Sequence, residues 1–353
     1  MQRVQRIAVV GATGFTGRLV VAALERKGGA AVRLVGRNRE KLARLLAEFR
    51  GAEVWPVAEW TSDALVEALT GCSAVISCAG PFLEAGRPVA EAAVRVDAPY
   101  CDSAGEQPFI KWAYERLDAQ ARLSGIPVVP GFGYDFVPGD LGAAIAAEGL
   151  EGLERVDVVY WQASTATSRG TRRSIIGVFG EPGYQWVDGR LHAERVARRQ
   201  RSVVVAGRKV AAVSIPAGES LMVPRHLDVP TVVTYTALPV PRRVLPLLAL
   251  LRLRAPRRLA GALAARAREP GERERRAPFA CHVQATAADG RRRAVLVEGR
   301  DLYGFTAEAL AELGSRMCAG AVDAVGACSP AQAVEPAAFL AAMDCTVREV
   351  EPQ

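Results

Sequence analysis

The sequence is poor in the residues from which metal sites and disulfide frameworks are built. Its 353 residues include three histidines and seven cysteines, and the cysteines are scattered, odd in number and without a Cys-x-x-Cys pair. Such a set argues against a zinc site or a disulfide framework, and it favours a reducing compartment. We therefore expect no metal site and a cytoplasmic location.

Long hydrophobic runs are also missing. The apolar stretch VLPLLALLRL, within residues 242–258, falls well short of the ~20 residues that a membrane span requires. It could lie in a membrane interface as an amphipathic helix. We interpret it instead as a lid or a dimer-packing helix, which leaves a homodimer open. The basic, then apolar start of the chain has the character of a signal peptide, but it continues directly into a glycine motif and is interpreted as a strand.

The positive charge is carried mainly by arginine. The formal net charge is +7, and many arginines lie in two stretches, residues 195–201 and 242–258. Basic patches can bind nucleic acid, anionic lipid or acidic substrates. Charge runs are more often solvated surface, so we expect no nucleic-acid partner and no stable membrane binding.

The first 130 residues alternate between apolar runs of strand length and stretches of helix length. The predicted strands cover residues 6–10, 31–35, 53–57, 74–78, 98–102 and 127–129. The predicted helices cover residues 15–27, 38–50, 61–70, 86–96 and 107–123. This alternation predicts a parallel sheet with helices on both faces. Residues 1–130 are therefore predicted to form an α/β dinucleotide-binding domain, a Rossmann-type doubly wound sheet.

The pattern changes after residue 130. Residues 131–302 contain strand-like runs separated by turns, and the pair Asp188-Gly189 is typical of a two-residue hairpin. We predict a mixed α/β, largely antiparallel substrate domain with a basic helical insert near residues 242–268. A helix is predicted again over residues 303–322, and the segment 303–353 is expected to pack back on the first domain.

The stretch VVGATGFTG, residues 9–17, places three glycines three apart between a predicted strand and a predicted helix. Gly11 would permit a tight turn, Gly14 would let the backbone approach a pyrophosphate, and Gly17 would let the helix pack close to the strand. The intervening residues complete the predicted phosphate loop, and they are Ala12, Thr13, Phe15 and Thr16.

The end of the second predicted strand indicates which dinucleotide binds. NAD sites usually carry an acidic residue there, to bind the ribose 2′-hydroxyl. The sequence VRLVGRNREKL has Arg37 and Asn38 at this point, and a guanidinium suits a 2′-phosphate. We therefore predict NADP, although these basic residues could also simply begin a solvent-facing helix. Trp60, after the third strand, could contact the edge of the adenine ring or could have only a packing role.

The fourth predicted strand ends in ISCAGPF, residues 76–82. Small residues followed by Gly-Pro would let the chain pass close to the nicotinamide and its ribose, and an aromatic ring could form a wall. The predicted contacts here are Cys78, Ala79, Gly80, Pro81 and Phe82.

With these motifs in place, the chain resembles the saccharopine dehydrogenase-like oxidoreductases, in the bacterial branch that includes trans-acting enoyl reductases. GATGFTG and GRNREKL resemble its cofactor half, and APYCDSAGE (98–106) its fifth strand. GFGYDFVPGDLG (131–142) is similar to its Gly-Phe-Asp-Ser-x-Pro-x-Asp-Leu signature, with Asp135, Pro138 and Asp140 on matching positions. The resemblance implies a Rossmann domain, a substrate domain and a returning helix.

The chain departs from the family pattern at positions that bear on the substrate. Tyr134 stands where the signature has Phe, and Phe136 where it has Ser. His226 lies in a stretch, residues 217–230, that replaces a more polar family block. These departures predict a specialised substrate pocket.

Hydride transfer asks the protein to align cofactor and substrate and often to supply a proton. We predict Tyr134 as the first candidate donor and His226 as the second, with Asp102 and Asp135 as orienting groups. Packing, capping or turn formation would also explain each of them.

The sequence thus predicts an NADPH-dependent reductase acting on a C=N, C=C or C=O bond of a small organic molecule. One alternative is enoyl reduction on a carrier-bound acyl chain. Another is a non-catalytic NADP sensor or membrane-associated binding protein.

Overall fold

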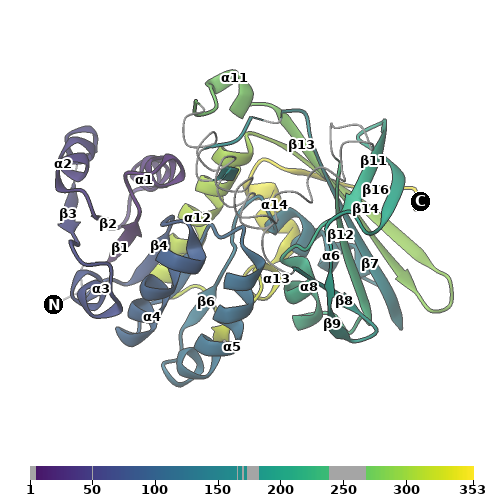
Figure 1. Cartoon of the computed structure of the whole chain (residues 1–353), viewed down its shortest axis with the longest axis horizontal. Helices are drawn as coiled ribbons and strands as arrows, with labels where there is room; N and C mark the ends of the chain where they lie inside the picture. Colours follow the sequence, from purple (N-terminus) through teal and green to yellow (C-terminus); the bar gives the residue numbers. More distant parts are fainter. Residues whose placement is uncertain (1–4, 50, 165, 169–170, 173–182, 238–267) are drawn as a thin grey trace. The chain divides into compact units, whose positions relative to one another are not determined.

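The computed structural model describes residues 5–49, 51–164, 166–168, 171–172, 183–237 and 268–353. The chain forms two compact units (Figure 1). The first unit comprises Met1–Ala104, Pro108–Tyr134 and Tyr303–Val334. The second comprises Gly105–Gln107, Asp135–Leu302 and Glu335–Gln353.

The first unit is built on a seven-stranded parallel sheet in the described part of the chain, with the order β15-β6-β5-β4-β1-β2-β3. Its strands are β1 (Arg6–Val10), β2 (Ala31–Gly36), β3 (Ala52–Pro56), β4 (Ala74–Ser77), β5 (Tyr100–Asp102), β6 (Pro127–Val129) and β15 (Gly326–Ala327). The order 3-2-1-4-5-6 is that of a doubly wound dinucleotide-binding fold. The predicted Rossmann-type fold is therefore confirmed.

Helices connect these strands. They are α1 (Phe15–Lys27), α2 (Arg39–Glu48), α3 (Ser62–Leu69), the short π-helix η1 (Phe82–Gly86), α4 (Arg87–Arg95), α5 (Gln107–Leu123), α12 (Leu302–Cys318) and α13 (Pro330–Ala333). Side chains fix where two of them begin: Asn38 accepts a hydrogen bond from the Lys41 amide, and Thr61 from the Ala64 amide. Strand β1 is buried over four of its five residues, as expected for a central strand covered on both faces.

Helix α12 returns to the first unit late in the chain. Gly314 allows this close packing, because a Cβ there would lie 2.5 Å from the Ile76 Cδ1 atom of β4. On the surface, the Lys27 Nζ atom of α1 lies 2.6 Å from the Glu312 carboxylate of α12, and Arg26 forms an ion pair with Glu308. The predicted return of a C-terminal helix is confirmed.

The second unit contains a mixed nine-stranded sheet in the described residues, with the path β10-β11-β12-β7-β13-β14-β16 and the hairpin β8–β9 attached to β12. The strands are β7 (Leu153–Gln162), β8 (Gly183–Val187), β9 (Arg190–Glu194), β10 (Gln200–Val205), β11 (Arg208–Ser214), β12 (Thr231–Ala237), β13 (Pro278–Ala287), β14 (Arg292–Arg300) and β16 (Thr346–Val350). β12 and β7 pair in parallel, and the other pairs are antiparallel.

Helices of the second unit are α6 (Val137–Ala147), α8 (Glu219–Met222), the 3₁₀ turn η2 (Val223–Arg225), α11 (Glu272–Arg275) and α14 (Pro336–Ala342). α6 is almost wholly buried and packs on β13 and β14. Gly142 lets it approach the sheet, because a Cβ there would lie 2.8 Å from Val283 Cγ2. The predicted mixed, largely antiparallel second domain is confirmed.

Asp188 and Gly189 both have positive φ, 50° and 72°, and join β8 to β9 as the predicted two-residue turn. In contrast, the expectation that all of 303–353 packs on the first domain is wrong. Residues 335–353 belong to the second unit, because β16 pairs with β14 and α14 contacts α6. The boundary expected after residue 130 falls after Tyr134. The predicted helical insert near 242–268 lies outside the described residues, apart from residue 268.

Candidate functional site

Three predicted cofactor segments meet at the carboxyl ends of neighbouring strands in the first unit. The Gly11 amide donates to the Val35 carbonyl at 2.9 Å, which joins the glycine turn to the end of β2. A Cβ on Gly11 would lie 2.9 Å from the Ala79 nitrogen, so this turn also touches the chain leaving β4. Gly11 has a φ of +79°, which a side chain would strain. The fold thus brings residues 11–17, 37–38 and 78–82 to one edge of the sheet.

The glycine turn fits a dinucleotide pyrophosphate. A Cβ on Gly17 would lie 2.3 Å from the Gly11 carbonyl oxygen, so glycine here is required for α1 to pack on the turn. Gly14 is exposed and caps α1 without a side chain that could accept bonds from the first turn. The first turn of α1 carries no acidic residue. Its amides and the helix dipole are therefore available to an anion.

The remaining residues of the phosphate loop divide between packing and surface. Ala12 is fully buried, so it serves the packing of the turn. The Phe15 ring packs edge-on against Tyr303 of α12, with centroids 5.0 Å apart. Thr13 and Thr16 are half-buried. Phe15 therefore has a packing role besides its predicted place in the loop.

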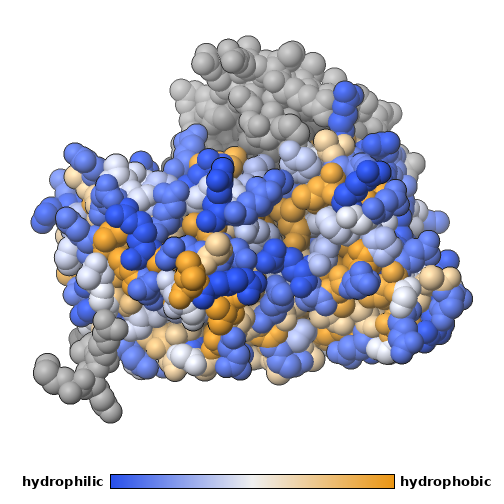
Figure 2. Space-filling view, turned by 90° about the horizontal axis from the view of Figure 1, so that it is seen from below, coloured by the Kyte–Doolittle hydropathy of each residue, from blue (hydrophilic) through white to orange (hydrophobic). Residues whose placement is uncertain are grey.

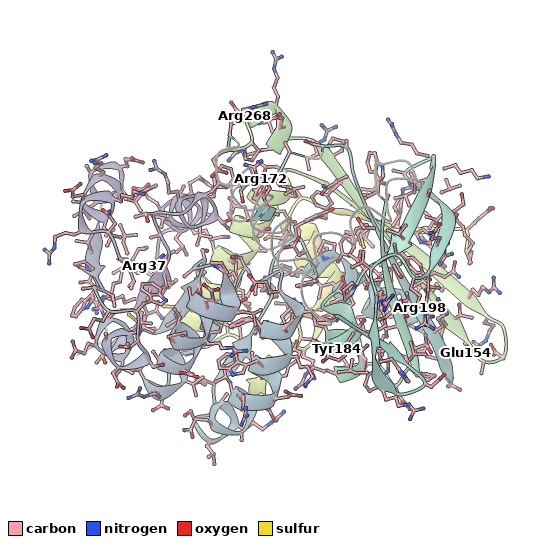
Figure 3. All side chains as sticks on the ribbon, viewed as in Figure 1. Arg37, Glu154, Arg172, Tyr184, Arg198 and Arg268 are labelled. Carbon is pink, nitrogen blue, oxygen red and sulfur yellow. The ribbon has the colours of Figure 1, made fainter. Side chains whose placement is uncertain are left out.

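Arg37 follows β2 directly and is exposed (Figure 3). Within the described residues it makes no hydrogen bond or ion pair, and its guanidinium lies over the Trp60 ring, 5.6 Å from the centroid. Asn38 uses its side-chain oxygen to cap α2, at 2.9 Å from the Lys41 amide. Of Arg37 and Asn38, it is therefore Arg37 whose N–H donors are available to a 2′-phosphate.

Segment 78–82 approaches the glycine turn mainly through its backbone. Phe82 is 5% exposed and packs on Phe109, with centroids 5.4 Å apart, so little of its ring could form a wall for a ligand. Desolvation raises the pKa of the Cys78 thiol to about 12, so this cysteine is a neutral group at physiological pH. Gly80 is exposed, and Cys78, Ala79 and Pro81 are half-buried.

Asp102 ties two loops together. Its carboxylate is fully buried at the end of β5, and Oδ1 accepts hydrogen bonds of 2.8 Å from both the Ala104 and the Gly131 amides. These bonds connect the chain leaving β5 with the chain leaving β6. The position gives Asp102 a structural task at the carboxyl edge of the sheet, whatever it contributes to chemistry.

Tyr134 and Asp135 stand where the chain passes from the first unit to the second. The Tyr134 amide donates to Thr306 Oγ1 of α12 at 3.0 Å, and the residue is 8% exposed. Asp135 is exposed, and its Oδ2 atom lies 2.8 Å from the position of a Cβ on Gly105. Their roles remain predictions.

His226 has a partner that the sequence did not indicate. Its Nε2 atom lies 2.9 Å from Oδ1 of Asp140, a fully buried residue of α6 that sits in the signature-like segment. The two residues are 86 positions apart, and the fold of the second unit brings them together. Tyr134 and Asp102 belong to the first unit, whereas Asp135 and His226 belong to the second.

A buried acidic cluster in the second unit was also missed. Glu219 is fully buried, its Oε1 accepts a hydrogen bond of 2.5 Å from the Tyr160 hydroxyl, and its Oε2 accepts one of 3.1 Å from Thr234. The Gly139 amide donates to the Tyr160 oxygen at 3.1 Å. Desolvation, reinforced by the Asp140 charge, raises the pKa of Glu219 to about 8 despite these bonds. A protonated carboxyl at neutral pH is therefore expected here.

Among the described residues, no group of three or more His, Cys, Asp and Glu side chains could hold a metal ion. In the same part of the chain, every helix is too short or too polar to cross a bilayer. On the face drawn in Figure 2, hydrophobic patches are interrupted by hydrophilic residues.

Comparison with known proteins identifies the first unit. Residues 7–129 match the model of the saccharopine dehydrogenase NADP binding domain. A trans-acting enoyl reductase of Mycobacterium tuberculosis is 30% identical over 141 residues, which cover 38% of this chain and 34% of the relative. A saccharopine dehydrogenase-like oxidoreductase of Bos taurus is 29% identical over 168 residues, covering 43% of this chain and 39% of the relative. The chain thus spans well under half the length of these relatives.

A solved structure extends the likeness to the whole fold. Apo saccharopine dehydrogenase (L-Glu forming) from Saccharomyces cerevisiae matches with a TM-score of 0.60 over 98% of this chain and 100% of the yeast chain, at 13% identity. At that identity the match shows the fold alone. The first unit is an NADP-binding domain of Rossmann type. The likeness to saccharopine dehydrogenase in sequence-family terms covers residues 7–129 of the chain.

Proposed function

We propose that this protein is an NADPH-dependent oxidoreductase that transfers a hydride to a C=N, C=C or C=O bond of an organic molecule. The observation that carries the proposal is the glycine turn between β1 and α1, where Gly11 and Gly17 leave no room for a Cβ and Gly14 is exposed. The NADP-binding family model supports the same cofactor. The cofactor supplies the hydride when bound, and the protein aligns it and excludes water.

The chain's own residues divide the task in this proposal. Gly14 and the first-turn amides of α1 would hold the pyrophosphate, and Arg37 would bind the 2′-phosphate. Residues 78–82 would pass along the nicotinamide ribose with their backbone. Tyr134 or His226 would donate a proton, with Asp135 or Asp140 as the orienting carboxylate. Of these groups, the structure records the pair His226–Asp140 at 2.9 Å.

A second candidate is reduction of an enoyl group on a carrier-bound acyl chain. It is favoured by the relatives named trans-acting enoyl reductase. The net charge of +7 would suit an acidic carrier or a coenzyme A thioester. This candidate differs from the first in its substrate and not in its cofactor.

Isotope transfer tests the activity directly. The purified protein would be incubated with NADPH deuterated at C4 and with three sets of acceptors: enoyl thioesters on a carrier or coenzyme A, ketones, and imines formed in situ. Mass spectrometry of the products then shows whether deuterium reaches carbon. Deuterated product from carrier-bound enoyl substrates alone would select the second candidate. Tight NADPH binding without any transfer would favour a non-catalytic sensor.

Cofactor choice is tested separately by binding. Arg37→Ala should weaken NADPH by about 1.5–3 kcal/mol, the scale of a charge-assisted hydrogen bond, and leave NADH nearly unchanged. Arg44→Ala is the matched control, because Arg44 is an exposed arginine of the same helix region that pairs with Glu40. Equal losses for both cofactors, or equal losses in both variants, would refute the role of Arg37.

A further inference from the structure

Two arginines, Arg33 of β2 and Arg37 just after it, lie over tryptophan rings, and their surroundings differ. Arg33 lies 4.8 Å from the Trp55 ring centroid, and Arg37 lies 5.6 Å from that of Trp60. Arg33 is 6% exposed, and its guanidinium donates a hydrogen bond of 2.5 Å to the Glu53 carboxylate. It also donates to the carbonyls of Ala68 and Thr70, at 2.7 and 3.0 Å. The first pair is therefore part of the packing of the sheet edge.

The second pair is arranged differently. Arg37 is exposed and keeps all its donors available within the described residues. The Trp60 ring beneath it is fixed, because its Nε1–H group donates to the Ala85 carbonyl at 2.9 Å. Ala85 belongs to η1, just after β4, whereas Trp60 follows β3. Since β2 and β1 separate β3 from β4 in the sheet, this bond holds the ring over the carboxyl edge that carries the glycine turn.

We propose that Trp60 is a positioning residue for recognition of the 2′-phosphate, acting through Arg37. The inference rests on the proposed function, which assigns Arg37 to that phosphate. A guanidinium held over a ring by a cation–π contact keeps its N–H groups available for a bidentate contact with phosphate oxygens. A freely rotating arginine side chain would lose conformational entropy on binding the phosphate. A ring that already restricts the side chain before binding reduces that entropic cost. Trp60 thus favours NADPH over NADH without touching the phosphate.

The test compares ligands that differ in the 2′-phosphate. Calorimetric titrations would measure NADPH against NADH, and adenosine 2′,5′-bisphosphate against 5′-AMP. Trp60→Leu should weaken the two 2′-phosphorylated ligands by a factor of about 3 to 10, the range of a cation–π contact, and change the other two less than about twofold. Trp60→Phe keeps a ring but loses the bond to Ala85, so it should restore part of the selectivity. Trp55→Leu is the matched control and should leave selectivity unchanged.

A double-mutant cycle separates this inference from the proposed function. If Arg37→Ala abolishes selectivity and Trp60→Leu has no further effect in that background, the two residues act together as proposed. If Arg37→Ala abolishes selectivity but Trp60→Leu and Trp60→Phe both retain it, the role of Trp60 is refuted while the cofactor site stands. Loss of all four ligands alike in a folded Trp60→Phe protein would mean that the ring contacts the adenine, which also overturns the inference. If Arg37→Ala leaves selectivity intact, the assignment of Arg37 itself fails.

Discussion

Replacing Glu219 with glutamine should change how the stability of the protein depends on pH. Glu219 is fully buried among Tyr160, Thr234 and the Gly139 backbone, and burial raises its pKa from 4.5 to about 8. In the unfolded chain the carboxyl regains its ordinary value. Glu219→Gln keeps the shape and the hydrogen-bonding capacity but cannot ionise, and the hydroxyls of Tyr160 and Thr234 can accept as well as donate.

Proton linkage determines how the Glu219 carboxyl changes the free energy of unfolding with pH. Between about pH 5 and pH 7.5 the folded protein keeps a proton on Glu219 that the unfolded chain has released, so raising the pH favours unfolding. The contribution is fully present below the unfolded pKa and is lost as the pH rises through the folded pKa of about 8. One pKa unit corresponds to about 1.4 kcal/mol. The free energy of unfolding of the parent, minus that of Glu219→Gln, should therefore fall by about 1.4 kcal/mol per pH unit in this window.

Urea unfolding followed by circular dichroism at several pH values between about 5 and 8 measures this difference. Glu154→Gln is the control, since it removes a carboxylate from the exposed start of β7 in the same sheet. The free energy of unfolding of the control should change with pH in the same way as that of the parent protein. If the free energy of unfolding of Glu219→Gln also changed with pH as that of the parent does, the reasoning would be refuted. The buried carboxyl would then carry the same charge in the folded and the unfolded protein.

Four other substitutions test the site. Gly17→Ala should destabilise the first unit by about 1–3 kcal/mol in thermal or urea unfolding, because its Cβ would lie 2.3 Å from the Gly11 oxygen, whereas Gly14→Ala, with its nearest contact at 3.2 Å, should mainly weaken NADPH binding. The reverse ranking would contradict this geometry. Asp102→Ala should cost about 1.5–3 kcal/mol of stability, since it removes the Oδ1 atom to which two backbone amides donate; an unchanged melting temperature would argue against the structural role. Tyr134→Phe should keep stability and NADPH affinity but lower kcat by about 10²–10⁴-fold if the hydroxyl donates the proton, and turnover at the parent rate would assign that proton elsewhere.

Periodicity predicted the first unit well because most of its strands are short, buried and apolar. The predicted strand 6–10 and the helices 15–27 and 107–123 agree with β1, α1 and α5 to the residue. Two strands escaped this reasoning for physical reasons. β15 has two residues, too few for any period, and β16 is an edge strand whose side chains are largely exposed, so no face of it reads as apolar. Missing β16 led to the wrong placement of residues 335–353.

Part of the candidate site could likewise be predicted from the sequence, and part could not. The glycine turn and Arg37 could be predicted as candidates from the sequence, because a pyrophosphate and a 2′-phosphate would demand particular residue types at particular points of a local motif. The pair His226–Asp140 and the cluster around Glu219 could not. They depend on α6, α8 and β12 meeting in three dimensions, and a glutamate in the stretch AGESLM looks like an ordinary surface residue.

The contrast between Arg33 and Arg37 shows why residue type alone does not define a cofactor contact. Both lie on the same stretch of chain, four positions apart, and both stack on a tryptophan. Arg33 stands opposite Glu53 in the register of β2 and β3, and that carboxylate also pairs with Arg6 at 2.8 Å. β3 ends at Pro56, opposite Gly36, so Arg37 emerges just past the last paired position and meets no carboxylate among the described residues. Whether an arginine near a strand end faces a carboxylate on the neighbouring strand therefore depends on register, which the local motif does not contain.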